Sequence, residues 1–255
     1  TRVCNFYYGS KSKALIKKAK SLPLNGNNLI SFDEVEIISR KSIKKLSIKK
    51  INDLPHLLKK IVKKDIKLIT KKKKFKNLNL KTLPKIMGVL NLTPDSFSDG
   101  GKYNKNYLAK KHLNFLFNSG ANIVDIGGES TRPGSKPISS KIEWNRVKYI
   151  LNNFNKKNFL SLDTRKSHIM EKGINLGVAL INDVSGLSYD KNSIKILKKY
   201  KIPFVLQHSL GNPDVMQNNP KYKNVLLDIY DFFEKKIDYL RMNGIDHSNI
   251  ILDPG

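Results

Sequence analysis

Cysteine, tryptophan and arginine are scarce in this chain of 255 residues, and long apolar runs are missing. The one cysteine, Cys4, excludes a disulfide within the chain and a metal site built on several thiolates, and it is consistent with a reducing compartment. No apolar run approaches the roughly 18 residues that a membrane helix needs, and no basic-then-apolar signal peptide opens the chain. We therefore expect a cytoplasmic protein without a membrane partner.

Negative charge is also scarce: 21 acidic residues face 48 basic ones, which gives a formal net charge of +27. A strongly basic balance can indicate nucleic-acid binding. Only six of the basic residues are arginine, which nucleic-acid readers favour for two-point contacts, and lysine is spread along the chain among many Asn and Ile residues. This composition is typical of genes whose codon usage has drifted toward A/T-rich codons. We therefore predict no nucleic-acid partner, although the positive field would attract anionic substrates.

Residues 1–82 are predicted to form an N-terminal extension, a small α/β appendage to which we assign no role. Its apolar patterns predict strands at 3–8 and 30–38 and helices at 10–22 and 53–64. The sequence between 22 and 28 is rich in Pro, Gly and Asn and predicts a loop. The lysine-rich block at 71–76 predicts a solvated linker.

The segment 83–255 alternates short apolar runs with helical patterns. Strands are predicted near 85–91, 122–126, 159–162, 179–183, 203–207 and 249–252. Helices are predicted at 104–119, 138–155, 166–176, 190–200 and 222–244. Such alternation implies parallel strands with helical crossovers. Polar residues follow each strand, which favours a TIM (β/α)8-type barrel, with about six βα units present, over an open sheet; its site would lie at the C-terminal mouth.

Two strand–loop segments carry the most specific pattern. Residues 86–101 read IMGVLNLTPDSFSDGG, and residues 121–134 read ANIVDIGGESTRPG. Each is a short apolar strand followed by turn formers and side-chain oxygens, with a helical stretch between them, so together they predict a βαβ unit. NLTPDSFSDGG followed by DIGGESTRPG resembles the two signature segments of dihydropteroate synthases, the folate-pathway enzymes.

The resemblance implies a transferase that condenses 6-hydroxymethyl-7,8-dihydropterin diphosphate with 4-aminobenzoate to give 7,8-dihydropteroate and pyrophosphate. It also implies Mg²⁺ as cofactor, inhibition by sulfonamides, and a homodimer at full length. By the family pattern, two further βα units should follow the strand near 249–252. The chain, which begins with Thr1 rather than Met, is therefore expected to be an inactive fragment, and the Lys and Arg of the family's last strands cannot be assigned.

Three polar side chains directly follow apolar strands, and the resemblance implies that they bind the pterin: Asp163, Asn182 and Asp253. A buried carboxylate that accepts N–H bonds from a ligand is compensated, whereas an unpaired one is costly. Any one of these residues alone would more often cap a helix. Their recurrence at successive strand ends, within a recognised family, favours the ligand-facing interpretation.

The diphosphate site implied by the resemblance uses Asn91, Thr131 and Arg132, with Mg²⁺ held by Asn91 and the substrate. A guanidinium bonds phosphate oxygens at two points, and Mg²⁺ keeps few protein ligands. The alternative for Arg132 is an ion pair with Glu129 on the same loop. Asp99 is expected to stabilise positive charge on the pterin methylene when its loop closes over the site.

The same loop closure would bring Phe97 and Pro133 around 4-aminobenzoate; the alternative for Phe97 is hydrophobic anchoring of the loop. Asp95 is a second candidate for the charge-stabilising role given to Asp99; the alternative is that it caps the turn.

The fifth strand of the segment departs from the family pattern. Gln207 and Ser209 stand where the family usually has two Met residues, so the face toward the pterin is expected to be less apolar. His208 keeps its place, either as a general base or as a packed, hydrogen-bonded side chain.

Three other functions remain as alternatives: a pterin-dependent methyltransferase barrel, a non-catalytic pterin-binding protein, and a basic nucleic-acid-binding protein. The methyltransferase would need neither STRPG nor the aspartate-rich first loop.

Overall fold

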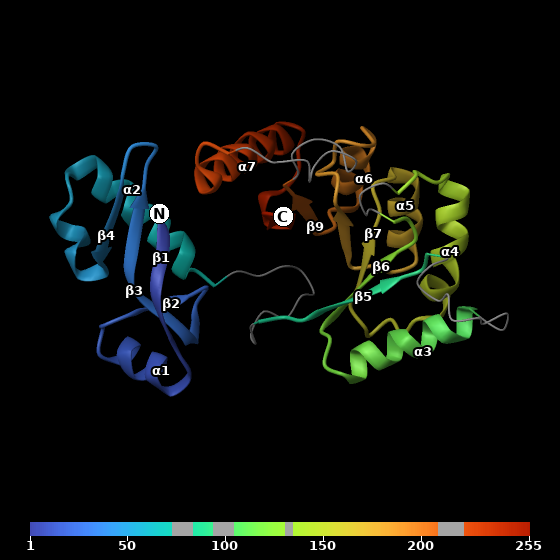
Figure 1. The fold of residues 1–255 in the computed structure, drawn as a ribbon, viewed down its shortest axis with the longest axis horizontal. Helices are drawn as coiled ribbons and strands as arrows, with labels where there is room; N and C mark the ends of the chain where they lie inside the picture. The colour runs from blue at the N-terminus through green and yellow to red at the C-terminus, as the bar shows by residue number, and fades with distance from the viewer. Residues whose placement is uncertain (73–83, 94–104, 131–134, 209–221) are drawn as a thin grey trace. The chain divides into compact units, whose positions relative to one another are not determined.

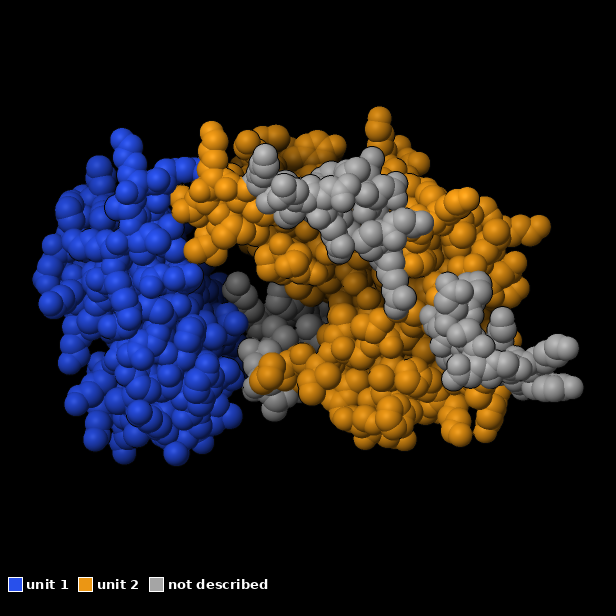
Figure 2. All heavy atoms as spheres, viewed as in Figure 1, with its two compact units in different colours: residues 1–74, 79–83 blue, residues 75–78, 84–255 orange. Residues whose placement is uncertain are grey.

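The computed structural model describes residues 1–72, 84–93, 105–130, 135–208 and 222–255 (Figure 1). The chain divides into two compact units, coloured separately in Figure 2. Residues 1–72 belong to the first unit, and the described residues from 84 onward belong to the second. Within these described ranges, no helix has the length and apolarity required to cross a membrane.

The first unit is an antiparallel sheet with two α-helices and a short 3₁₀ helix. Its long central strand, β3 (Asn27–Ile38), pairs with β1 (Arg2–Tyr8) along one edge and with β2 (Leu22–Leu24) and β4 (Ile43–Ser47) along the other. The helices are α1 (Gly9–Lys17), η1 (Ile48–Asp53) and α2 (His56–Thr70). A small buried core joins them: Phe32, Val35, Leu46, Ile51, Leu54 and Val62.

Some details of this unit differ from the sequence prediction. The helix predicted at 10–22 ends at Lys17, and the segment predicted as a loop contains the short strand β2. Strand β4, which reads IKKLS, was not predicted because its side chains are mostly exposed and only its pairing with β3 defines it. Pairing between distant segments is a tertiary property that local propensity does not encode.

The second unit is a parallel sheet whose strands follow the chain order. In the described residues its order is β10-β9-β8-β7-β6-β5. The strands are β5 (Met87–Asn91), β6 (Ile123–Gly127), β7 (Leu160–Asp163), β8 (Leu180–Asp183), β9 (Phe204–Gln207) and β10 (Ile250–Asp253). The crossover helices are α3 (Lys105–Asn118), α4 (Ser140–Asn153), α5 (Ser167–Asn175), α6 (Ser193–Tyr200) and α7 (Val225–Met242). The predicted TIM-type barrel with about six βα units is thereby confirmed.

The two faces of this sheet differ in chemistry. Side chains of one parity, such as Val124, Ile126 and Leu162, are fully buried in the large apolar cluster shared with the helices. Helix α5 packs so closely on this face that a Cβ at Gly173 would lie 2.4 Å from Leu162 Cδ2. The opposite parity carries polar residues, including Asp125. We call this second surface the inner face; it positions the candidate site.

Candidate active site

A row of aligned residues crosses the carboxyl ends of the first four barrel strands. Asn91 of β5 is the register partner of Gly127 in β6, Gly127 of Asp163 in β7, and Asp163 of Asn182 in β8. Partners in adjacent parallel strands point to the same face of the sheet, so the three polar side chains of this row share the inner face. The structure therefore brings together Asn91, Asp163 and Asn182, as the sequence predicted for strand ends that meet at one mouth.

Gly127 allows the side chains on either side of it to approach each other. A Cβ at this position would lie 3.2 Å from Asn91 Oδ1 and 3.3 Å from Asp163 Oδ2. Because glycine has no Cβ, both oxygens can lean over β6 toward the same space. Amide and carboxylate oxygens are the ligands that Mg²⁺ accepts, usually one or two from protein with the rest from water and substrate. The oxygens of Asn91 and Asp163 therefore fit the chemistry of a Mg²⁺ ion that takes its other ligands from water and a substrate.

Asp125 lies one step deeper on the inner face, two residues before Gly127, and is only 5% exposed. Asn182 Nδ2 donates a hydrogen bond of 2.8 Å to Asp125 Oδ2. Oδ1 of Asp125 and Oδ1 of Asn182 are both buried and have no hydrogen-bond partner in the described part of the chain. Burial raises the pKa of the Asp125 carboxyl. Unpaired buried acceptors are rare in native proteins, so this pair is suited to a ligand that donates hydrogen bonds.

Asp163 has the most perturbed carboxyl of the inner face. Burial, followed by the negative charges of Asp125 and Asp183, raises the pKa of Asp163 well above its ordinary value. A carboxyl in this state gains from any ligand that brings N–H donors or positive charge. Buried carboxyls with strongly shifted pKa values are often found at functional sites.

Asp253 ends β10 on the same face but nearer the mouth. Its register partner is Gln207, whereas Asn182 is aligned with Val205, two residues earlier in β9. Asp253 is thus on the inner face with Asp163 and Asn182, but two residues further along the strands toward their carboxyl ends. Gln207, which replaces a family Met, lies on the inner face as well.

His208 is packed against aromatic rings. It is 6% exposed, and its ring lies edge-on to Phe232 with a centroid distance of 4.8 Å and an interplanar angle of 90°. Its backbone N–H donates to the carbonyl of Asp253 at 2.8 Å. This environment favours the packed interpretation of His208 over a general base.

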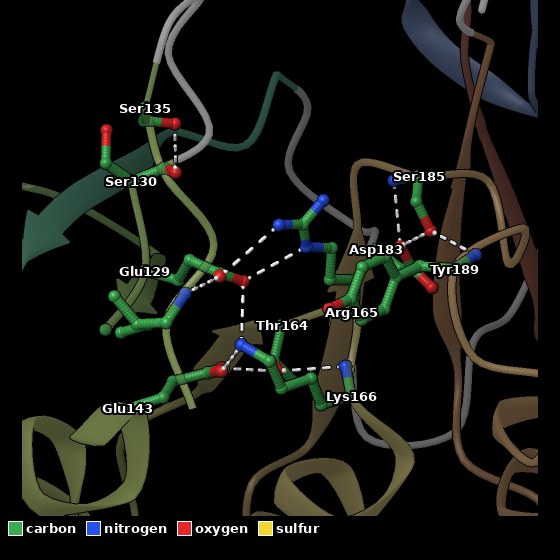
Figure 3. Close-up of polar contacts among 12 residues, drawn as sticks. Glu129, Ser130, Ser135, Glu143, Thr164, Arg165, Lys166, Asp183, Ser185 and Tyr189 are labelled. Carbon is green, nitrogen blue, oxygen red and sulfur yellow. Dashed lines mark hydrogen bonds and ion pairs between the residues drawn. The ribbon is translucent and has the colours of Figure 1, made fainter. Parts of the chain in front are cut away.

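A buried network of four charged side chains lies behind the mouth (Figure 3). Glu129 follows β6, Arg165 and Lys166 follow β7, and Glu143 belongs to the first turn of α4. Lys166 Nζ lies 2.9 Å from Glu129 Oε2 and 2.6 Å from Glu143 Oε2. Arg165 Nε lies 3.1 Å from Glu129 Oε2. The two cations balance the two carboxylates, which is the condition for burying charge without a large penalty.

Seven predicted site residues lie outside the described residues: Asp95, Phe97, Asp99, Thr131, Arg132, Pro133 and Ser209. Their assignments stay predictions.

Sequence reasoning missed Asp125 and the charged network. Asp125 stands inside an apolar run, and its parity with Gly127 places it on the inner face, a signal that strict alternation could have given. The partners in the network are up to 37 residues apart. No local pattern pairs them.

Comparison with known proteins agrees with this geometry. The family model described as "Pterin binding enzyme" matches residues 87–255, so the chain belongs to the family of pterin binding enzymes. The resemblance predicted from the sequence is confirmed by named relatives. The chain is 41% identical over 183 residues to the dihydropteroate synthase of Clostridium beijerinckii, covering 71% of this chain and 65% of that protein. It thus spans slightly less than two thirds of that relative's length.

Solved structures show the same likeness. The Yersinia pestis dihydropteroate synthase in a sulfonamide drug complex matches with a TM-score of 0.62 and 37% identity, covering 70% of this chain and 64% of that one. The Burkholderia cenocepacia dihydropteroate synthase complexed with 7,8-dihydropteroate matches with a TM-score of 0.60 and 32% identity, covering 70% and 60%.

Proposed function

We propose that the protein is a dihydropteroate synthase, a transferase of folate biosynthesis that joins 4-aminobenzoate to 6-hydroxymethyl-7,8-dihydropterin diphosphate. One observation carries the proposal. In a chain of the pterin binding family, Asn91, Asp163 and Asn182 share the inner face at the carboxyl ends of parallel strands. Beside them lie buried acceptors that have no hydrogen-bond partner among the described residues. In barrels of this kind the active site lies at that end.

The pterin ring is held by Asp163, Asn182 and Asp253. A pterin presents several N–H donors along one edge, and two carboxylates and an amide carbonyl accept them. The raised pKa of Asp163 means that burial and the neighbouring carboxylates disfavour the negative charge there. Bound N–H donors offset this cost, so the pocket gains more from a ligand rich in donors than from an apolar one.

The diphosphate is bound by Thr131 and Arg132 together with Asn91. Mg²⁺, held by Asn91 with the substrate's oxygens, would neutralise charge on the leaving pyrophosphate. The described contacts of Glu129 leave its carboxylate no acceptor site for a further donor. Each carboxylate oxygen of Glu129 already accepts two donors, from Arg165, Lys166 and the Ile138 backbone, which fills the four sites that a carboxylate offers.

The reaction is a displacement at the pterin methylene carbon. The C–O bond to the diphosphate breaks and its electron pair leaves with pyrophosphate, while the amine nitrogen of 4-aminobenzoate forms the new C–N bond and loses a proton. Asp99 stabilises the positive charge that develops on the methylene. Phe97 and Pro133 provide apolar contacts for the aminobenzoate ring, with Asp95 at the turn of the same loop.

Residues at the end of β9 affect the affinity for the pterin and not the reaction itself. Gln207 lies beside Asp253 in the register and brings a polar side chain to the inner face. With Ser209 it replaces two family Met residues, so we expect a less apolar pocket and weaker pterin binding than in relatives with Met. His208 stabilises the end of this strand by packing.

The assembly and location follow the family expectation: a cytoplasmic homodimer at full length, with small-molecule substrates and no nucleic-acid partner. The net charge of +27 then serves to attract the anionic pterin diphosphate. No role is proposed for residues 1–72.

The test is an activity assay on the protein at the full length its gene encodes. We expect formation of dihydropteroate and an equal amount of pyrophosphate with Mg²⁺ present, and competition between sulfonamides and 4-aminobenzoate. Arg132→Ala and Asp99→Ala should each lower kcat by roughly 100-fold or more, as expected when charge stabilisation in a transition state is removed, without changing the melting temperature. Pterin binding without turnover would instead identify a non-catalytic pterin-binding protein.

A further inference from the structure

Asp125 is a buried carboxylate of the inner face to which the proposed chemistry gives no role. It lies in the middle of β6, two residues before the strand ends at Gly127, and is 5% exposed. Burying a carboxylate carries a desolvation cost that its apolar neighbours Val124 and Ile126 do not carry. Its presence at this depth therefore calls for a reason other than packing.

Asp125 contacts Asn182 across an intervening strand. The two residues belong to β6 and β8, which are separated by β7. Two strand spacings put their backbones about 10 Å apart. The β7 residue aligned with Asp125 is Ser161, whose side chain is small and 0% exposed. The side chains of Asp125 and Asn182 can therefore meet over β7, where Asn182 Nδ2 donates to Asp125 Oδ2 at 2.8 Å.

This contact fixes which end of the Asn182 amide is free. A side-chain amide has two donors on its nitrogen and an acceptor oxygen, and either end can face a ligand. An ionised carboxylate only accepts hydrogen bonds, so Asp125 holds Nδ2 and repels Oδ1. The hydrogen bond favours the charged form of Asp125 and so acts against the rise in its pKa that burial causes.

The free oxygen of Asn182 lies beside other acceptors. Asn182 Oδ1 and Asp125 Oδ1 are both buried and have no hydrogen-bond partner among the described residues. Asp163, the register partner of Asn182, adds its carboxyl on the same face. Such a surface complements a ligand edge that carries hydrogen-bond donors. It disfavours an edge of acceptors, because opposed lone pairs would be buried without a donor between them.

We propose that Asp125 is a positioning residue that sets specificity: its carboxylate holds Asn182 by Nδ2, so that Asn182 presents only its oxygen to the ligand and the site selects a donor there. The inference rests on the proposed function in one respect, because it takes the ligand to be a pterin. The contact between Asp125 and Asn182 does not depend on that function.

The charge of Asp125 has a second effect, which a control must separate from the first. The negative charges of Asp125 and Asp183 both raise the pKa of Asp163. Asp183 is also 0% exposed, but its side chain lies on the opposite face of β8, where Oδ1 accepts from the backbone N–H and the hydroxyl of Ser185. Removing either charge relieves Asp163, whereas only Asp125 holds Asn182. Asp183→Asn is therefore the matched control.

The experiment compares Asp125→Asn and Asp125→Leu with Asp183→Asn in the full-length protein. Both changes at position 125 keep the approximate size of the side chain. Neither fixes the Asn182 amide, because asparagine can bond to either end of it and leucine to none. Affinity is measured by calorimetry for 6-hydroxymethylpterin and for 6-hydroxymethyllumazine, in which a carbonyl oxygen replaces the 2-amino group. NMR follows the side-chain amide of Asn182, whose signals are identified by their loss in Asn182→Ala.

We expect the unsubstituted protein to bind the pterin more tightly than the lumazine. Both variants at position 125 should lower the ratio of the two affinities by about tenfold or more, the loss typical of a hydrogen bond to a charged group. Asp183→Asn should leave the ratio unchanged. The Nδ2 protons of Asn182 should be protected from exchange with solvent in the unsubstituted protein and in Asp183→Asn, and should exchange faster in both variants at position 125.

An unchanged affinity ratio in both variants at position 125 would overturn the inference. An equal loss of both affinities is one such result, and it would indicate a purely structural role. A fall of the same size in Asp183→Asn would overturn it too, because the effect would then belong to the charge. If the unsubstituted protein bound neither probe, the proposed function would fail instead, and exchange of the Nδ2 protons would alone decide whether Asp125 holds Asn182.

Discussion

Replacing Asp163 by Asn should make the unliganded protein more stable and its pterin binding much weaker. Burial and the charges of Asp125 and Asp183 raise the pKa of Asp163 well above the ordinary value of 3.8. Between the two pKa values the folded state holds a proton that the unfolded state has released. Stability therefore falls as pH rises from about 3.8 through the folded pKa, and the deficit is complete above it.

The magnitude follows from linkage. Each unit of pKa shift costs about 1.4 kcal/mol at neutral pH, and an uncharged amide of the same shape removes that cost. In a protein of this size, 1 kcal/mol corresponds to about 2–4 °C in Tm. Pterin binding should weaken by roughly 10- to 150-fold, because a hydrogen bond to a charged acceptor contributes about 1.5–3 kcal/mol.

The assay is thermal unfolding from pH 4 to pH 8, combined with a pterin titration at pH 7. The gain in Tm for Asp163→Asn should be largest at neutral pH and should shrink toward pH 4. Asp246→Asn is the control, because hydrogen bonds from Ser248 lower the pKa of Asp246 and it lies outside the inner face. A lower Tm at pH 7 for Asp163→Asn, or unchanged pterin affinity, would refute the reasoning.

Three further outcomes are expected. Gly127→Ala places a methyl group 3.2–3.3 Å from Asn91 Oδ1 and Asp163 Oδ2. The kcat/KM of the full-length enzyme should therefore fall by up to about 100-fold, while far-UV circular dichroism is unchanged. Normal kinetics would contradict the conclusion that both oxygens lie over Gly127. Lys166→Met leaves two buried carboxylates facing one cation, so the free energy of unfolding in urea should fall by about 3–5 kcal/mol. The exposed control Lys199→Met should lower it by only about 0–1 kcal/mol. Equal losses would contradict the burial of the network. The pKa of Glu129 is lowered, so its carboxylate contributes stability that is present above pH 4.5 and is lost as the pH falls through the folded pKa. Glu129→Gln should therefore reduce the loss of stability on acidification. An unchanged dependence of stability on acidic pH would refute this.

The barrel elements were predictable because each buried strand is short, apolar and bounded by turn formers. Strand β7, predicted at 159–162, runs over Leu160–Asp163, and helix α5, predicted at 166–176, runs over Ser167–Asn175. Strands β2 and β4 were not predicted, because one contains a proline and the other has exposed lysines. Their formation depends on pairing with β3.

The site was predictable where a polar residue ends a strand, and not where it acts through a distant partner. Asp163 and Asn182 belong to the first kind, and register alone brings them together. Arg165 belongs to the second, because its partner Glu129 lies 36 residues away and only the pairing of β6 with β7 brings the two together. A pattern in the sequence marks the strand ends but not the contacts behind them.

The central claim is that the inner face of the barrel strands binds a pterin. A crystal structure of the protein soaked with 7,8-dihydropterin tests it most directly. We expect the ring on the inner face, with its N–H groups within hydrogen-bond distance of Asp163 and of Asn182 Oδ1. A pterin bound elsewhere, with Asp163 and Asn182 facing only water, would contradict the account.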